Sequence, residues 1–182
     1  MKSGSQSGLR EQILAQAIHS LAKHHLPRVE RCLSLLSSSE IWWRPNAASN
    51  SIGNLVLHLS GNVRQWIISG LGGAPDRRVR DKEFAERGPI SRRTLRSQLR
   101  NTLTEAARVI GRLSGDDLES FHEIQGFTVT GFKAVQHVVE HFAFHTGQII
   151  MVAKMKRDYA VSFTQLPGEK RLNPSRAKLP VL

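Results

Sequence analysis

Apolar residues recur every three or four positions along most of the sequence, and this periodicity constrains the fold more than any other feature. Such spacing predicts amphipathic α-helices, and the alternation typical of strands is nearly absent. Four segments carry it, at roughly residues 9–36, 50–69, 91–113 and 131–155. Four amphipathic helices with no strands interposed between them predict an all-α fold, a four-helix bundle.

The breaks between these segments suggest how the helices are connected. Pro27 interrupts the first segment, which predicts a kink or a break near residues 24–26. The run 70-GLGG-73 ends the second segment, and residues 74–89 are charged and carry Gly88-Pro89, as expected of a linker. This linker is long enough for a crossover connection between helices 2 and 3. Residues 121–132 have some β character and predict an extended loop or a short hairpin.

Length and composition suggest one cytoplasmic domain. We expect a single domain over residues 1–182, with a core at about 9–156 and a basic, irregular tail at 157–182. No apolar run approaches the roughly 20 residues that cross a bilayer, and the first residues lack an apolar signal core. The single cysteine, Cys32, excludes an internal disulfide framework and fits a reducing cytosol. We interpret Cys32 as a small core residue rather than a nucleophile.

The charge balance is strongly basic, with 26 Lys and Arg against 15 Asp and Glu, for a net charge of +11. Such an excess attracts polyanions. The basic residues gather at 77–82, 92–100 and 169–178, where no aromatic side chains are interleaved to stack on bases. No zinc-finger pattern is present either. We therefore disfavour nucleic acid as a partner and expect solvated loops and a basic tail.

Three histidines, His137, His141 and His145, follow one another at intervals of four in the last predicted helix. Neighbours at this spacing lie nearly above one another on a helix, so two imidazoles can bind one metal ion. His58 lies on the apolar stripe of the second predicted helix. Facing helices of a bundle build metal sites in this way. The sequence therefore predicts a metal site between the second and fourth helices.

Each of these histidines taken singly is more often an ordinary core or boundary residue. A cluster without a ligand would bury several polar nitrogens at about 1–3 kcal/mol each, so for the set we favour metal binding. Three imidazoles and an open position suit zinc or nickel. Spacing alone does not choose between the pairs 137/141 and 141/145.

Two longer patterns around these histidines resemble those of a known family. The segments 51-SIGNLVLHLSGNVRQWI-67 and 137-HVVEHFAFHTGQI-149 are similar to those of the DinB-like superfamily of small bacterial metal-binding four-helix bundles. The neighbouring 42-WWRPN-46 and 70-GLGG-73 look like one uncharacterised branch of it. The resemblance covers roughly residues 9–155. It implies that His58, His141 and His145 hold the metal, with His137 outside the ligand set.

The resemblance also implies an activity and partners. Other members are transferases and isomerases that activate a low-molecular-weight thiol, such as bacillithiol or mycothiol, at the metal. We therefore expect a metal-dependent thiol S-transferase or hydrolase acting on a small molecule, with no protein nucleophile. Exposed aromatic surface on the second predicted helix or near Trp43 would favour a homodimer. The alternative is a non-catalytic basic or stress-related binding protein with structural histidines. The sequence leaves open whether the protein is an enzyme.

Other polar residues near the predicted ligands have less certain roles. Asn62, one turn after His58, is the preferred polar neighbour of the metal. Gln148 could reach His145 or pack between helices. Arg64 could bind an anionic substrate but is expected at the surface, as is Glu140.

Overall fold

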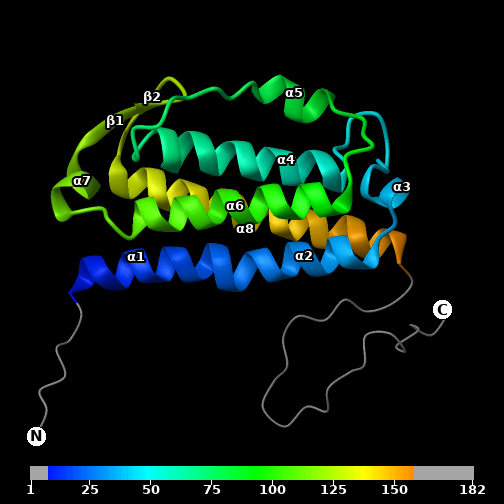
Figure 1. The fold of residues 1–182 in the computed structure, drawn as a ribbon, viewed down its shortest axis with the longest axis horizontal. Coiled ribbons are helices and arrows are strands. Elements are labelled where there is room, and N and C mark those ends of the chain that lie inside the picture. Colours follow the sequence, from blue (N-terminus) through cyan, green and yellow to red (C-terminus); the bar gives the residue numbers. More distant parts are fainter. Residues whose placement is uncertain (1–7, 158–182) are drawn as a thin grey trace, which may run out of the picture.

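The computed structural model describes residues 8–157, and these form a mostly helical bundle of long, roughly aligned segments (Figure 1). The first comprises α1 (Leu9–His19), a π-helical turn η1 (Ser20–His25) and α2 (Leu26–Leu35). The others are α4 (Ile52–Val63) with its π-helical continuation η2 (Arg64–Ser69), α6 (Arg92–Ile110) and α8 (Gly131–Lys156). Within residues 8–157 this confirms the predicted helical bundle. No helix of this part of the chain is both long and apolar enough to cross a membrane.

The connection between η2 and α6 crosses the length of the bundle. Helices α4 and α6 run in the same direction, so residues 70–91 return along the outside of α4 (Figure 1). This confirms the crossover connection, but the segment is more than a linker because it contains helix α5 (Arg80–Ala85). Almost all of α4 is buried, as expected for a helix that is covered on its outer side too.

Trp42 fixes the far end of this connection. Its indole N–H donates to the carbonyl oxygen of Ile90 at 3.2 Å. The ring lies against Gly53 of α4 and against Gly88, whose φ of 77° is readily adopted only by glycine. A β-carbon at either glycine would meet the indole, so both positions allow the ring to lie between α4 and the connection.

Three short elements complete the described chain. Helices α3 (Ser38–Ile41) and α7 (Gly115–Glu119) each begin at a serine capping box. Strands β1 (Phe121–Ile124) and β2 (Phe127–Thr130) form an antiparallel hairpin in which Phe121 pairs with Thr130. Of the two expectations for this segment, the hairpin is the correct one.

The first long segment continues as helix from α1 through η1 into α2. The π-helical turn of residues 20–25 stands where a kink was expected, and Pro27 follows in the first turn of α2. Proline has no N–H to donate, and the π-helical turn just before it changes the hydrogen-bond pattern locally, with Leu26 N–H donating to Leu21 O. The sequence therefore continues as helix on both sides of the proline.

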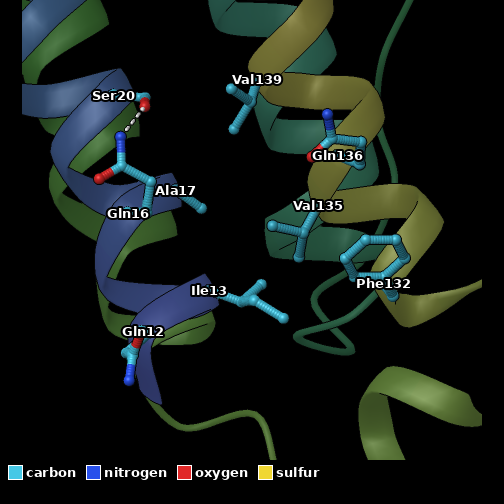
Figure 2. A pocket seen from close by; sticks show the side chains of 9 residues that line it. All are labelled: Gln12, Ile13, Gln16, Ala17, Ser20, Phe132, Val135, Gln136 and Val139. Atoms are coloured by element: carbon cyan, nitrogen blue, oxygen red, sulfur yellow. Dashed lines mark hydrogen bonds between the residues drawn. The ribbon is translucent and has the colours of Figure 1, made fainter. Parts of the chain in front are cut away.

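Helices α1 and α8 leave a pocket of about 370 Å³ between them, which we call the α1–α8 pocket (Figure 2). Ile13 and Ala17 line it from α1, and Phe132, Val135 and Val139 line it from α8. The remaining lining side chains are neutral and polar: Gln12, Gln16, Ser20 and Gln136. No ionisable side chain lines this pocket.

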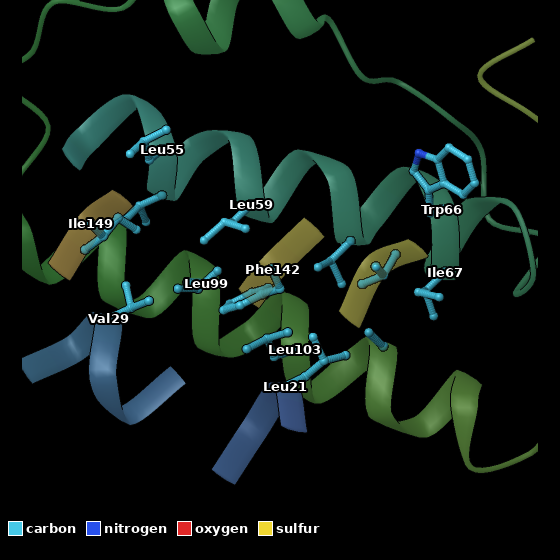
Figure 3. Close-up of a cluster of buried hydrophobic side chains, with 14 of the residues drawn as sticks. Leu21, Val29, Leu55, Leu59, Trp66, Ile67, Leu99, Leu103, Phe142 and Ile149 are labelled. Carbon is cyan, nitrogen blue, oxygen red and sulfur yellow. The ribbon is translucent and has the colours of Figure 1, made fainter. Parts of the chain in front are cut away.

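The apolar core lies at the centre of the bundle, where side chains from all four long segments meet (Figure 3). Phe142 of α8 is fully buried, among residues that include Leu59 of α4, Leu103 of α6 and Leu21 of η1. Cys32 is also fully buried, and burial raises the pKa of its thiol to about 12. It is a small core residue, as predicted, and at neutral pH it is not a thiolate.

Candidate metal centre

His58, His141 and His145 converge between α4 and α8. His141 Nε2 lies 3.1 Å from His58 Nε2 and 3.1 Å from His145 Nε2. One nitrogen from each of the three residues lies within 4.8 Å of the others. Helices α4 and α8 bring together positions 83 residues apart, and the helical repeat places His145 one turn beyond His141. The cluster could hold a metal ion.

The outer nitrogens of two of these rings have acceptors that fix where their protons lie. His58 Nδ1 is 2.9 Å from Glu83 Oε2, and His145 Nδ1 is 2.7 Å from Gln148 Oε1. A carboxylate and an amide oxygen only accept, so each Nδ1 carries the proton and each Nε2 keeps its lone pair. Arg78 Nη2 also lies 3.1 Å from His58 Nδ1, but it donates to the charged Glu83 Oε2 at the shorter distance of 2.8 Å. Two lone pairs therefore point toward His141 Nε2, which can donate a hydrogen to only one of them. This is the arrangement by which acceptors orient histidines that bind metals.

His141 differs from the other two histidines in its outer nitrogen. Its Nδ1 is buried and has no hydrogen-bond partner among residues 8–157. Burial, together with the neighbouring histidines, lowers the pKa of His141 to about 3. Burial also lowers the pKa of His145. Both rings are therefore neutral at pH 7, which is the form that binds a metal.

The donor set fits a first-row divalent metal. Metal–imidazole bonds of about 2.0–2.1 Å at a tetrahedral angle put two ligand nitrogens roughly 3.3 Å apart. Two of the three observed separations, at 3.1 Å, are close to this value, and all three nitrogens lie within 4.8 Å of one another. Three imidazoles would leave a fourth position open, as in catalytic rather than structural zinc sites.

The crossover connection contributes a buried ion pair, Glu83 with Arg78, that contacts His58. Glu83 of α5 accepts from His58, and Arg78 donates to both oxygens of Glu83 at 2.8 Å. These side chains are nearly buried, with 4% of Arg78, 11% of Glu83 and 6% of His58 exposed. Burial opposes ionisation of Glu83, but the hydrogen bonds from Arg78 and His58 outweigh it and lower its pKa. The carboxyl group is therefore ionised at neutral pH.

A glycine makes room for this carboxylate. Glu83 Oε1 occupies the space that a β-carbon at Gly61 of α4 would fill. Glycine inside a helix usually destabilises it by about 0.5–1 kcal/mol relative to alanine. At position 61 it allows Glu83 to approach the helix that carries His58.

Sequence reasoning missed Arg78 and Glu83 because they lie in the segment predicted to be a linker. The crossover itself was the available signal, since a connection that returns along α4 must bring some of its polar residues to the helix surface. It did not indicate which of them would do so.

His137 lies beside the cluster rather than in it. Its ring is stacked on Trp66 at a centroid distance of 3.9 Å, and it lies 5.5 Å from the ring of His141. Asn62, expected next to the metal, has its amide nitrogen 3.3 Å from His137 Nε2 instead. Burial lowers the pKa of His137. The Oδ1 of Asn62 is buried with no partner among the described residues.

The remaining polar residues behave as follows. Arg64 is exposed and donates to Glu105 at 2.7 Å, and Glu140 is exposed and accepts from Gln136. Gln148 reaches His145, one of its two expected roles. The basic tail from residue 158 lies outside the described residues.

A pocket of about 360 Å³, which we call the histidine pocket, opens beside the cluster. His58, His137 and His141 line it, with the basic residues Arg78, Arg80 and Lys133. The other lining side chains come from η2 and α4 and from the hairpin: Trp66, Asn62, Gln125, Phe127 and Val129. A molecule in this pocket would contact two of the three clustered histidines.

Comparison with known proteins gives a family and a fold. The sequence model of a family described as a protein of unknown function (DUF1572) matches residues 10–169. No curated protein matches the sequence.

Among solved structures, the chain is similar to a DinB-like protein, YjoA, from Bacillus subtilis. The TM-score is 0.61 at 16% identity, over 84% of this chain and 96% of that one. A DinB-like protein from Bacillus cereus gives 0.57 at 16% identity, over 74% and 87%. A conserved protein from Enterococcus faecalis gives 0.60 at 14% identity, over 81% and 94%. Likeness at such identities shows a common fold.

Proposed function

The chain belongs to the DUF1572 family of proteins of unknown function and has a DinB-like fold, and from its histidine cluster we propose that it is a divalent-metal protein. His58, His141 and His145 would hold the ion, with zinc or nickel as the expected metal. We further propose that the site serves a thiol S-transferase or a hydrolase acting on a small molecule.

The convergence of three imidazole nitrogens carries the metal proposal. With protons on their Nδ1 atoms, His58 and His145 both present lone pairs to His141. His141 is neutral at pH 7 because its pKa is about 3. Without a cation, at most one of the two close nitrogen pairs is a hydrogen bond. A cation at their centre would use all three lone pairs.

The activity proposal rests on the open side of the cluster. A divalent metal lowers the pKa of a thiol or water that it binds and so supplies a nucleophile at neutral pH. Glu83 and Gln148 would orient the ligands, and the histidine pocket would admit the substrate and a thiol such as bacillithiol or mycothiol. Cys32, which is fully buried and protonated, offers no competing nucleophile.

Elemental analysis of protein purified without an affinity tag tests metal binding. We expect about one bound metal per chain, as purified or after addition of zinc or nickel, from the single cluster. Less than about a tenth of an equivalent, with no uptake of either metal, would refute the proposal for a site of this kind. Thiol-transfer assays with and without a chelator then test the activity separately.

A metal that only stabilises the bundle is the alternative within the same site. It predicts a higher melting temperature on metal addition and no thiol transfer with any small electrophile. The basic, non-catalytic binding protein predicts instead that binding to DNA is lost at physiological salt and is unaffected by His141→Ala.

The proposed homodimer has some support on α8. Phe144, Met151 and Met155 are more than half exposed and lie on one face of this helix. Light scattering of the purified protein measures its mass directly, and a mass of one chain at all concentrations would refute the dimer.

A further inference from the structure

We propose that the histidine pocket binds a small organic anion, with its carboxylate at Arg80 and Lys133 and its apolar part against Phe127 and Val129. This proposal deepens the proposed function and rests on it only in treating the ligand as the substrate of the metal site. The anion binding itself is carried by the pocket.

The position of the pocket links it to the cluster. His58 and His141 belong to its lining, so a molecule that fills it contacts two of the residues proposed to hold the metal. Four parts of the chain build its walls: α4 with η2, the crossover connection, the hairpin and α8. Concave sites with a few converging polar groups are where small molecules usually bind.

The charge of the lining selects an anion. Arg78, Arg80 and Lys133 line the pocket, and no Asp or Glu does. The charge of Arg78 is balanced by Glu83, which it contacts with two donors. Within residues 8–157, no carboxylate lies within salt-bridge distance of Arg80 or of Lys133. Two unbalanced positive charges beside a concave surface attract anions.

Arg80 is also held in place at the pocket. Its guanidinium lies 4.8 Å from the centre of the Phe84 ring, as in a cation–π contact. Its N–H groups have no acceptor among the described residues, so they remain available to a carboxylate, which they can bind with two parallel hydrogen bonds.

The hairpin gives the pocket an apolar wall. Phe127 is 59% exposed, which is high for a large apolar side chain. Val129, two residues further along the same strand, is half-buried. Trp66 donates its indole N–H to Gln125 Oε1 at 3.0 Å, which fixes the turn of the hairpin to η2. The amide N–H groups of Gln125 are left to donate to a ligand. The expected ligand is therefore an amphipathic carboxylate rather than an inorganic ion.

A matched pair of probes tests this directly. Calorimetric titration with 4-phenylbutanoate and with its neutral amide, 4-phenylbutanamide, compares two molecules of nearly equal shape. We expect the carboxylate to bind about tenfold more tightly at low salt, since each exposed charge contact contributes roughly two- to fivefold. Both titrations are made on zinc-loaded and on metal-free protein.

Three variants assign the difference to the pocket. Arg80→Gln and Lys133→Gln should each weaken carboxylate binding about two- to fivefold and leave the amide unchanged. Arg93→Gln, which removes an exposed arginine of α6 outside the pocket, should change neither. Equal affinities for the two probes, no saturable binding of either, or an equal effect of Arg93→Gln would overturn the proposal.

Metal content measured on the same samples separates the two proposals. If the protein takes up no metal but still prefers the carboxylate through Arg80 and Lys133, the proposed function fails and the anion pocket stands. If it takes up metal and does not discriminate between the probes, only the anion pocket fails.

Discussion

Two pockets of nearly equal volume adjoin the first turns of α8, and their chemistry differs completely. The α1–α8 pocket measures about 370 Å³ and the histidine pocket about 360 Å³. Phe132 and Gln136 face the first, whereas their neighbours Lys133 and His137 face the second. A step of one residue rotates the side chain by about 100°, so one helix serves an apolar and a basic surface. Volume therefore says little about function, and the groups that converge on a pocket say much more.

The largest expected effect is the loss of a ligand in the histidine pocket. His141→Ala should weaken zinc binding by more than about 100-fold, beyond the 10–100-fold typical of groups that only orient ligands. His141 contacts both other histidines, so its loss leaves two imidazoles on different helices. Competition with a chromophoric chelator measures the affinity. Affinity within tenfold of the wild type would show that the metal is held elsewhere.

Glu83→Gln should weaken zinc binding about 10- to 100-fold, because the amide is a poorer acceptor for His58 Nδ1–H. The same substitution at Glu105, an exposed partner of Arg64, is the control and should leave zinc binding unchanged. If the two variants behave alike, the crossover connection plays no part in holding the site.

Gly61→Ala tests the same contact from the other side. A β-carbon at position 61 would displace the Glu83 carboxylate while favouring the helix, so we expect about tenfold weaker zinc binding without loss of helical stability. The two quantities are read from chelator competition and from urea unfolding. Retention of full zinc affinity would show that Glu83 finds another position from which to hold His58.

Acid should destabilise the metal-free protein through the histidine pocket. The pKa of His141 is about 3 in the folded protein, against about 6.5 in an unfolded chain. Between these two pH values the unfolded state therefore binds more protons than the folded state. The contribution of His141 to the unfolding free energy is therefore fully present above about pH 6.5 and is lost as the pH falls toward 3. Between pH 7 and pH 5 this residue should account for about 1–2 kcal/mol of the unfolding free energy.

Urea unfolding at the two pH values, compared with His141→Gln, measures this contribution. Burial lowers the pKa of His25 to about 4, so some pH dependence should persist in the variant. The Nδ1 of His25 is also buried without a partner in the described part of the chain. An unchanged pH dependence in His141→Gln would contradict the assignment.

The smallest effect is expected in the α1–α8 pocket. Val135→Ala removes a buried side chain and should lower the unfolding free energy by about 1 kcal/mol. Because no ionisable group lines this pocket, zinc affinity and probe selectivity should stay unchanged. A change in either would show that the two pockets are coupled through α8.

The bundle was predictable because its cause is local. Ile52, Leu55 and Leu59 already show the helical repeat in the sequence, and Ser51 begins the helix as its cap. The same repeat put His141 and His145 on one face. Spacing alone left His137 as a candidate, and the choice of the pair came from the resemblance.

Contacts across long sequence separations were not predictable in the same way. The approach of Glu83 to His58 depends on how the crossover connection lies on α4. The pairing of Asn62 with His137 depends on how α4 and α8 face each other. Neither arrangement leaves a periodic trace in the sequence. The short helix α5 was missed because a helix of six residues makes fewer than two turns, which is too short to show an apolar repeat in the sequence.

His58 and His141 stand 83 positions apart, and this separation has a consequence for biosynthesis. A nascent chain that has emerged only as far as α6 carries a single member of the cluster, so it offers no chelating site. The cluster is complete only once α8 has been synthesised and has docked against α4. An ion bound there, as proposed, would stabilise the complete bundle relative to every partly assembled form, since a ligand that binds only the native state shifts the equilibrium toward it. Metal uptake would therefore follow the docking of α8 against α4 and would stabilise the chain only after that step.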